Sequence, residues 1–445
     1  MENTKFLDNL SNSLGEIGAK INNLRYIIVI KNAFTVLTPV IIAGAFGTLF
    51  SAMVFNSDQG LAQIPALSWL ESLNPVASAL SYVTLSFLTI YVVFLIGIEL
   101  AKLNDVHSTF PGIIAVMSYL AVNPTFINFV NGEEVLKITN VLGKQYTDTK
   151  GLFLGMIVSI AAIELYCWLA RQDKLKIRMP DSVPSNVSTS FSALFPTIIT
   201  IFTMAFIGWA VHAVSGLYAY DIIYNLVQKP LESVSQGLPG LLILMLVAQL
   251  FWVIGIHGNQ MIKPVREPLL LAAIATNTEA FMAGTAVRDL PNIITMPFWD
   301  MYMSMGGSGV TIGLLVSVFM ISKAGPMREI AKLSAVPSIF NINEPVIFGM
   351  PIMLNPILAI PFIITPLITG SIGYVLTSIG FAGKAAVMVP WPFPPLINGY
   401  VATAGDWGAV ATQLLCIIVS IVIYFPFTKI ALKQEALSFE NSTEN

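Results

Sequence analysis

An ionisable residue, Glu344, lies inside an apolar stretch in the second half of the chain. This stretch, 337–361, reads PSIFNINEPVIFGMPIMLNPILAIP. Its five prolines and the amides Asn341, Asn343 and Asn355 argue against one straight transmembrane helix, because proline removes a backbone donor and clashes with the preceding turn. Irregular backbone at membrane depth is tolerated where protein buries it or where it lines a wet cavity. We therefore predict a functional site around Glu344, with a surface loop between two ordinary helices as the alternative.

A second group of residues that could do chemistry reads WVIGIHGN and follows another apolar run. His257 is one of three histidines in the chain. The nearby Gly255 and Gly258 would let another backbone or a ligand approach the imidazole closely. Trp252 and Asn259 complete the group, which indicates a binding site. The alternative is an imidazole whose hydrogen bonds are satisfied at a helix end.

Charged residues follow this group at two places. Lys263, Arg266 and Glu267 predict a charge cluster at the membrane interface. Arg288 comes after a run that contains amide, carboxylate and small residues, which makes it a candidate binding residue. The alternative for Arg288 is a loop ion pair with its neighbour Asp289.

Trp391, in the proline-rich segment VPWPFPP, is the last candidate residue. Tryptophans also gather at membrane interfaces, so one of them alone does not indicate binding. Together, however, tryptophan, Asn, His, Glu and Arg side chains suit a sugar. Aromatic rings pack on the apolar face of a pyranose, while polar groups bind its hydroxyls. Nothing in the sequence is typical of a metal cluster, a phosphate-binding loop or a Ser/His/Asp nucleophile, so no cofactor and no metal are expected.

The composition is that of a polytopic membrane protein. The 445 residues are 55% hydrophobic and 11% charged, against about 25% charged in soluble proteins, and the mean hydropathy is +0.76. The net charge of −3 does not favour nucleic acid as a partner. Cys167 and Cys416 lie in apolar runs, so a disulfide framework or a zinc site is not expected. The first residues lack the features of a signal peptide.

The elements that must position the candidate residues are membrane helices, so the expected fold is all-α. We predict about ten transmembrane helices plus one or two re-entrant hairpins. The apolar runs lie near 27–55, 76–100, 110–130, 151–170, 191–216, 238–256, 269–285, 309–322, 362–382 and 408–428. Among these, 269–285 and 309–322 are short or interrupted. Apolar residues at steps of three and four over 6–24 predict an N-terminal amphipathic helix along the membrane surface, with a soluble-domain helix as the alternative.

Two membrane domains are expected. The N-terminal domain, 1–220, holds its polar residues mainly in loops, whereas the C-terminal domain, 238–430, holds them inside apolar runs. This difference predicts a scaffold half followed by a working half that carries the sugar-type site. Tyrosines and prolines at 221–237 predict an interfacial linker, and 431–445 would form a cytoplasmic tail.

The distribution of Lys and Arg predicts that both termini lie in the cytoplasm. Basic residues precede the first span and follow the fourth, and the connection at 56–75 has none. The loop 131–150 argues against this orientation, because it would be external and yet carries Lys137, Lys144 and Lys150.

Two motifs, GIHGNQ at 255–260 and INEPVIFGMP at 342–351, resemble those of a known family. In this order and spacing they are similar to the membrane-spanning IIC component of bacterial phosphotransferase-system (PTS) sugar transporters, most of all the lactose/cellobiose/diacetylchitobiose family. The resemblance covers nearly the whole chain. It implies a homodimer in contact through its N-terminal half, and a C-terminal half with two re-entrant hairpins that encloses one sugar and moves across the lipid bilayer as a rigid body.

The resemblance also implies a function: a permease that moves a β-linked disaccharide of the cellobiose, diacetylchitobiose or lactose type across the bacterial cytoplasmic membrane. A separate phospho-IIB protein, which receives its phosphoryl group from IIA and carries it on a cysteine, would phosphorylate the sugar at the cytoplasmic face. No soluble domain of that kind is recognisable in this chain, and a thiolate at Cys167 or Cys416 would be disfavoured by its apolar surroundings. The sequence does not determine which disaccharide is bound.

The predicted sugar contacts follow from the motifs. The residues that match are Trp252, His257, Asn343 and Glu344, with Arg288 and Trp391 in less distinctive surroundings and Asn259 added from its position beside His257. Glu344 would accept the hydroxyl proton during phosphoryl transfer while His257 orients the oxygen; alternatively, Glu344 only binds hydroxyls. The rival interpretation of the whole chain is a proton-coupled sugar symporter that uses Glu344 and His257 as a proton relay.

Overall fold

The computed structural model describes residues 24–443, apart from 58–59, 107, 132–133, 178–179, 181–187, 189–190, 351 and 353–354. The amphipathic helix predicted over 6–24 lies outside the described residues, except for Leu24. Helices dominate the described chain. Six of them are long and apolar enough to cross a membrane: Arg25–Met53, Pro65–Lys102, Thr149–Ala170, Leu194–Ser215, Ile357–Ser378 and Trp407–Glu435. Each overlaps a predicted span, although Pro65–Lys102 begins well before the predicted 76–100, and together they support a polytopic membrane fold.

Contacts divide the chain into two compact units, each of which is described by itself. Unit 1 contains Ala45–Ser81 and the chain from Glu232 onward, and unit 2 contains Asn23–Gly44 and Tyr82–Leu231. The helix α2 (Arg25–Met53) contributes to both units, and α3 (Asn74–Leu85) and α11 (Lys229–Ser235) also cross their boundaries. All seven candidate site residues belong to unit 1.

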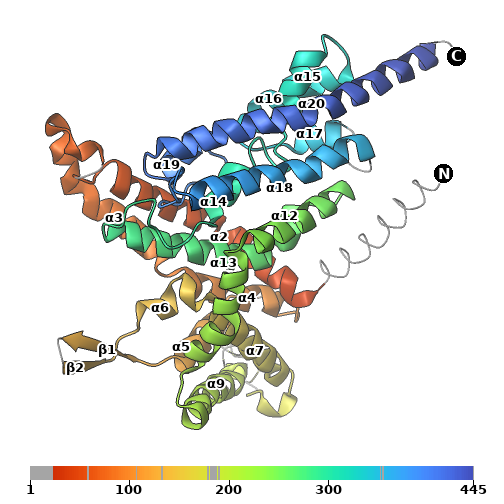
Figure 1. The fold of residues 1–445 in the computed structure, drawn as a ribbon. Helices are drawn as coiled ribbons and strands as arrows, with labels where there is room; N and C mark the ends of the chain where they lie inside the picture. Colours follow the sequence, from red (N-terminus) through yellow and green to blue (C-terminus); the bar gives the residue numbers. More distant parts are fainter. Residues whose placement is uncertain are drawn as a thin grey trace. The chain divides into compact units, whose positions relative to one another are not determined.

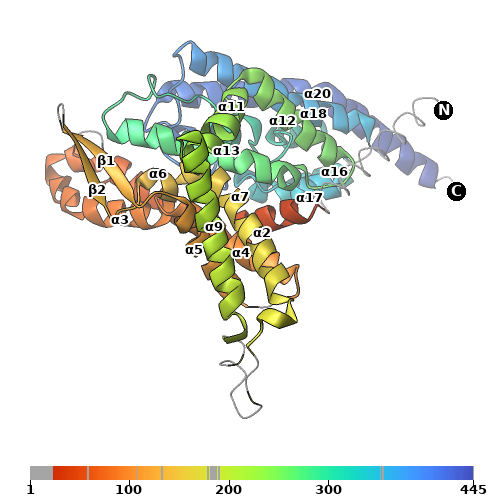
Figure 2. The same cartoon turned by 90° about the horizontal axis from the view of Figure 1, so that it is seen from below.

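Unit 2 is a bundle of apolar helices (Figures 1 and 2). The helix α4 packs against α5 and α7, and α9 packs against the same two helices. The elements besides α2 are α4 (Leu88–Lys102), α5 (Phe110–Val122), α6 (Lys144–Thr147), η3 (Thr149–Gly151), α7 (Leu152–Ala170), η4 (Asp173–Leu175), α9 (Leu194–Ser215), α10 (Ala219–Ile223), the π-helical turn η5 (Tyr224–Gln228) and α11 (Lys229–Ser235).

One predicted span in unit 2 is shorter than expected. The helix predicted over 110–130 ends at Val122, and the chain continues into an antiparallel hairpin of β1 (Phe126–Asn131) and β2 (Glu134–Thr139). Proline disfavours helical geometry in the residue before it, so the Asn-Pro pair directly after Val122 ends the helix. The fold is therefore not entirely α.

Unit 1 is built along its last helix. The helix α20 packs along α15 and α18, and α12 packs against α13 and α18 (Figure 1). The elements are η1 (Leu61–Gln63), η2 (Pro65–Leu73), α3 (Asn74–Leu85), α12 (Leu238–Val253), α13 (Gly258–Met282), α14 (Met296–Met303), α15 (Ile312–Ile321), α16 (Pro326–Ile339), α17 (Glu344–Gly349), α18 (Pro356–Ser378), α19 (Ile397–Ala402) and α20 (Trp407–Thr443).

The proline-rich stretch 337–361 is broken, as predicted. It contains the end of α16, a turn, the short helix α17 and the start of α18. Pro345 occupies the first turn of α17, where its missing N–H would have had no partner within the helix. Although proline disfavours helical geometry in the residue before it, Glu344 is the first residue of α17. Its carboxylate therefore lies directly after the turn.

An apolar core supports this turn. It joins side chains from α12, α15, α16, α17, α18 and α20, including Trp252, Val346, Phe362 and Tyr424. The Tyr424 hydroxyl donates a hydrogen bond to the Gly309 carbonyl oxygen at 2.8 Å. The core thus fixes the α16–α17 turn and the 304–311 loop to the same set of helices.

Candidate functional site

His257 and Glu344 meet at the ends of two helices. His257 directly precedes α13, and Glu344 begins α17. His257 Nε2 lies 3.9 Å from Glu344 Oε1, and the side chains are 41% and 48% exposed. This distance exceeds that of a direct hydrogen bond, about 2.7–3.2 Å, so both groups are open to a ligand.

A tight turn after α12 places His257. Gly255 has φ +86°, a conformation that costs glycine little and other residues more. Its N–H donates to the Trp252 carbonyl oxygen at 3.0 Å. Gly258 lies so close to the Ala248 carbonyl that a Cβ would not fit. The missing side chain at Gly258 thus allows the start of α13 to approach the α12 backbone closely.

Trp252 lies against the imidazole of His257, within the core. The ring centroids are 4.2 Å apart, and Trp252 is 2% exposed. Within the described chain, the buried atoms Trp252 Nε1 and His257 Nδ1 have no hydrogen-bond partner. An unsatisfied buried polar atom costs about 1–3 kcal/mol. Trp252 thus supports His257 in this conformation, and the pair retains unused hydrogen-bonding capacity.

The loop 304–311 joins the two amide residues predicted to contact sugar. Asn259 Nδ2 donates to Ser308 Oγ at 2.9 Å. Asn343 Nδ2 donates to the Ser308 carbonyl at 2.7 Å and to Thr311 Oγ1 at 2.9 Å. The side-chain donors of Asn343 are thus engaged by the protein. Asn343 fastens the loop to the α16–α17 turn.

Sequence reasoning overlooked this loop. Its MGGSGV run places three glycines within six residues, a pattern that can mark close backbone approach. Gly307 has φ +98°, and a Cβ at this position would overlap the Asn343 side chain. The glycine run was the signal that could have identified the loop.

Asn341 fixes the segment that carries Trp391. Its Nδ2 donates to the carbonyl oxygens of Trp391 and Phe393 at 2.7 and 2.9 Å, and its Oδ1 accepts from Gly306 N–H at 3.0 Å. The Trp391 side chain is 43% exposed. Trp391, unlike Trp252, therefore presents an open ring while its backbone is held by the α16–α17 turn.

Arg288 has a different environment. Its Nη2 lies 3.2 Å from Asp406 Oδ2, with the arginine side chain 57% exposed. The ion pair is therefore with Asp406 and not with the neighbouring Asp289 that sequence reasoning considered. Among the described residues, no interaction joins Arg288 to the six other candidates. The structure does not bring it to the His257–Glu344 pair.

Lys263, Arg266 and Glu267, predicted to form a charge cluster at the membrane interface, do form a cluster, but it is buried inside the protein. Lys263 and Arg266 are each 6% exposed. Lys263 Nζ and Arg266 Nη2 lie 3.5 and 4.0 Å from Glu267 Oε1, and the Arg266 guanidinium lies over the Trp299 ring at 4.9 Å. Packing of α13 against α12 and α14 buries these charges, which local sequence could not indicate.

Asp300, on α14, joins the same cluster. It is 9% exposed and interacts electrostatically with Arg266. The cluster thus contains two cations, Lys263 and Arg266, and two carboxylates, Glu267 and Asp300. Their charges cancel when all four groups are ionised. Buried charges need such partners because desolvation is costly. The cluster therefore ties α13, which begins next to His257, to α14.

The chemistry available at His257 and Glu344 is hydrogen bonding to hydroxyls and proton transfer. A carboxylate accepts hydrogen bonds, and imidazole can donate or accept. Trp391 has an exposed aromatic ring on a segment whose backbone is hydrogen-bonded to Asn341, in the turn before Glu344. These groups suit a neutral, hydroxyl-rich ligand such as a sugar.

Comparison with known proteins gives a consistent result. A family model described as "Phosphotransferase system, EIIC" matches residues 31–366. The oligo-beta-mannoside-specific EIIC component of Bacillus subtilis (strain 168) is 34% identical over 424 residues, covering 95% of this chain and 93% of that protein. The cellobiose-specific EIIC component of Geobacillus stearothermophilus is 29% identical, with 97% and 95% covered.

A solved structure agrees with these relatives. The crystal structure of the transporter ChbC, the IIC component from the N,N'-diacetylchitobiose-specific phosphotransferase system, matches with a TM-score of 0.90 and 28% identity, covering 97% of this chain and 99% of that one. Both motifs, GIHGNQ and INEPVIFGMP, lie inside the range matched by the family model. The resemblance seen in the sequence is thus confirmed: the chain belongs to the EIIC family of membrane sugar permeases of the phosphotransferase system.

Proposed function

We propose that this EIIC permease takes up a β-linked disaccharide of the cellobiose, diacetylchitobiose or lactose type. The names of the relatives, which include oligo-beta-mannoside, cellobiose and N,N'-diacetylchitobiose, support this substrate class. The observation that carries the proposal is the 3.9 Å separation of His257 Nε2 and Glu344 Oε1. One hydroxyl oxygen can lie about 2.8 Å from both atoms and so bind to both.

The site residues have distinct proposed roles. Glu344 and His257 hold one hydroxyl, and the open ring of Trp391 packs on a pyranose face. Trp252 supports the imidazole. Its Nε1–H donates a hydrogen bond to the sugar once sugar binding opens the site. The remaining proposed polar contacts are Asn259, the side-chain oxygen of Asn343, whose donors the 304–311 loop engages, and, away from the His257–Glu344 pair, Arg288.

Phosphoryl transfer follows binding in this proposal. The sugar hydroxyl oxygen attacks the phosphorus of phosphocysteine on a separate IIB protein, which IIA has phosphorylated. The new O–P bond forms as the S–P bond breaks, the cysteine leaves as a thiolate, and Glu344 accepts the hydroxyl proton. General-base assistance of this kind contributes about 10²–10⁴-fold. His257 orients the attacking oxygen.

The proposal includes the architecture of the transporter. Two copies pair through an N-terminal domain of about 1–220, and the domain at 238–430 carries the sugar, with the α16–α17 pair as a re-entrant hairpin. The 221–237 segment links the domains. Both termini, including the 431–445 tail, face the cytoplasm of the bacterium. The six candidate spans support the membrane location.

Vesicle transport tests the function. Right-side-out vesicles that enclose purified IIA, IIB and the general phosphotransferase proteins should form sugar phosphate in their lumen only with phosphoenolpyruvate. Accumulation of unmodified sugar on a proton gradient, without phosphoenolpyruvate, would instead establish the symporter interpretation. A screen of labelled β-linked disaccharides against the purified protein identifies the substrate.

The Glu344→Gln variant tests the base role. It keeps a hydrogen-bonding side chain of similar size but cannot accept the proton as a carboxylate does. We expect sugar affinity to fall by less than tenfold and IIB-dependent phosphorylation by at least a hundredfold. An equal loss of both would leave Glu344 as a binding residue only.

A further inference from the structure

Asn341 ends the helix α16 in a left-handed backbone conformation. Its φ is +62°. Its N–H donates to the Ser338 carbonyl oxygen at 3.0 Å, and the Ile342 N–H donates to the Pro337 carbonyl oxygen at 3.1 Å. This pair of hydrogen bonds is the Schellman motif, whose left-handed position is usually glycine and sometimes asparagine. Glycine would satisfy the backbone at this position, so the helix end alone does not require the Asn341 side chain.

The Asn341 side chain joins the helix end to two other segments. It is 8% exposed. Its amide nitrogen donates to the carbonyl oxygens of Trp391 and Phe393, and its oxygen accepts from the Gly306 N–H. The amide thus uses both of its donor hydrogens and one of its acceptor positions. One buried side chain therefore connects three segments that lie far apart in the sequence.

The segment that carries Trp391 is stiff. Four of the six residues in 390–395 are prolines. Proline fixes φ near −65° and lacks an N–H, so this segment can supply few donors for its own carbonyl oxygens. The Asn341 amide holds two of these oxygens, which lie two residues apart. Because two points on a stiff segment fix its orientation as well as its position, these bonds also set the direction in which the Trp391 side chain leaves the backbone.

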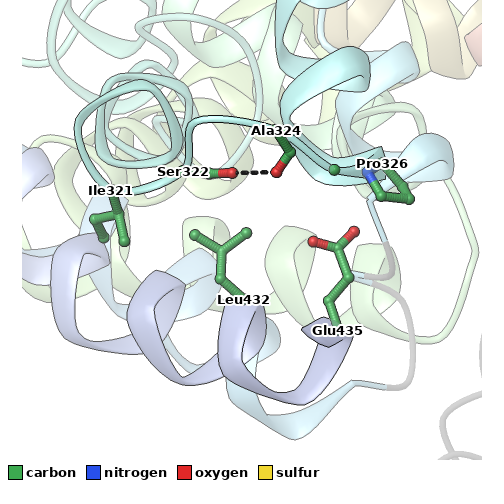
Figure 3. Close-up of a pocket in the computed structure, with 7 residues that line it drawn as sticks. Ile321, Ser322, Ala324, Pro326, Leu432 and Glu435 are labelled. Carbon is green, nitrogen blue, oxygen red and sulfur yellow. Dashed lines mark hydrogen bonds between the residues drawn. The ribbon is translucent and has the colours of Figure 1, made fainter. Parts of the chain in front are cut away.

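The helix that precedes Asn341 is held at its other end as well. Glu435 Oε1, on α20, accepts a hydrogen bond from the Met327 N–H at 3.0 Å, in the first turn of α16. Figure 3 shows a pocket at this end of the helix, with the Glu435 side chain directed from α20 toward Pro326, the first residue of α16. A carboxylate is stabilised at a helix N-terminus. The helix is thus anchored at its start by α20, and Asn341 presents its amide from a fixed element.

We propose that Asn341 is a positioning residue for sugar binding, which holds the Trp391 ring in a fixed relation to Glu344. Asn341 belongs to the turn that leads into Glu344, and its amide is bonded to the backbone of Trp391. The ring and the carboxylate are therefore parts of one hydrogen-bonded frame, and a sugar that contacts both meets them at a set separation. This inference rests on the proposed roles of Trp391 and Glu344 in sugar binding. Asn341 acts through Trp391 and not by contact with the sugar.

Two substitutions remove the Asn341 donors in different ways. Asn341→Gly deletes the amide and keeps the Schellman motif. Asn341→Asp keeps the shape and the tolerance of the left-handed conformation, but it places a carboxylate against two carbonyl oxygens. Asn140→Gly is the matched control, because Asn140 is an exposed asparagine of unit 2 with φ +60°. Size exclusion and thermal unfolding of the full-length proteins in detergent would confirm that all three variants are folded.

A double-mutant cycle with Trp391→Ala separates positioning from a general loss of structure. Isothermal titration with cellobiose and with N,N'-diacetylchitobiose gives the dissociation constants. With Trp391 present, Asn341→Gly and Asn341→Asp should each raise the dissociation constant about threefold to tenfold, the share of an aromatic contact. With Trp391→Ala, they should raise it by less than twofold, as should Asn140→Gly in both backgrounds. Equal losses in the two backgrounds would overturn the proposal, because a merely structural role acts whether or not the ring is present.

A second measurement requires no sugar. Protein labelled with 5-fluorotryptophan gives a fluorine NMR signal for Trp391, which is assigned by its loss in Trp391→Phe. We expect Asn341→Gly to shift or broaden this signal and Asn140→Gly to leave it as it is. A Trp391 signal that is the same in Asn341→Gly as in the parent protein would overturn the proposal. If neither sugar binds to the parent protein, the proposed function fails, and the fluorine signal still decides whether Asn341 positions Trp391.

Discussion

His257 and Glu344, which belong to two separate motifs, lie with Nε2 and Oε1 3.9 Å apart at the starts of α13 and α17. Neither helix alone could create this pair. The α12–α13 turn places one side chain, the α16–α17 turn places the other, and the 304–311 loop is hydrogen-bonded to residues beside both.

Loss of the imidazole should weaken sugar binding. His257→Gln cannot reproduce the position of Nε2, and a hydrogen bond that involves a charged group contributes about 1.5–3 kcal/mol. We expect the dissociation constant to rise by at least tenfold in isothermal titration with the disaccharide that the screen selects. His212→Gln, on α9 of unit 2, is the control and should change affinity by less than twofold. Unchanged binding by His257→Gln would remove His257 from the site.

The open ring of Trp391 should contribute by stacking. Aromatic contacts of this type add about 0.5–1.5 kcal/mol beyond area burial. Trp391→Ala should therefore raise the dissociation constant of the sugar by about threefold to tenfold, and Trp391→Phe should restore part of the lost affinity. Trp168→Ala removes a tryptophan that is 58% exposed on unit 2 and should have no effect. An equal loss in the Phe and Ala variants would argue against stacking.

The contact between Gly307 and Asn343 can be isolated with two glycine substitutions. Gly307 has φ +98° and Gly284 has φ +94°, so alanine strains the backbone at both positions. A Cβ at Gly307 would meet Asn343, whereas one at Gly284 would meet nothing within 4 Å. We expect Gly307→Ala to lower stability by about 1–3 kcal/mol more than Gly284→Ala, measured by thermal unfolding in detergent. Equal losses would mean that the loop simply moves away.

The buried charge cluster on α13 gives a prediction about stability. Glu267→Gln leaves Lys263 and Arg266 with one carboxylate, Asp300, and breaking a buried ion pair costs about 3–5 kcal/mol. Glu329→Gln removes a similar partner from Lys332, where both side chains are more than half exposed, and should cost about 0–1 kcal/mol. Thermal unfolding of the two variants measures the difference. Similar melting temperatures would contradict the burial of the cluster.

Residue types and local patterns determined much about this protein. The hydropathy of the apolar runs indicated a membrane protein. The prolines of 337–361 indicated a broken stretch, and Pro345 and Pro356 occupy the first turns of α17 and α18, where a missing N–H leaves no helical hydrogen bond unmade. The GIHGNQ and INEPVIFGMP motifs were enough to indicate the family. The helix predicted over 110–130 was too long, and the reason is also local, since the Asn-Pro pair after Val122 already signals a helix end.

The environment of each side chain was decided by the tertiary structure. Trp252 and Trp391 look alike in sequence, yet the core covers one ring and leaves the other open. Lys263 and Arg266 resemble interfacial charges, but α12 and α14 pack over them and make them a buried cluster. Asn343 is engaged by a loop that lies far from it in sequence. Burial, ion pairing and hydrogen-bond satisfaction depend on residues distant along the chain, so the local pattern could select the site residues but could not assign their contacts.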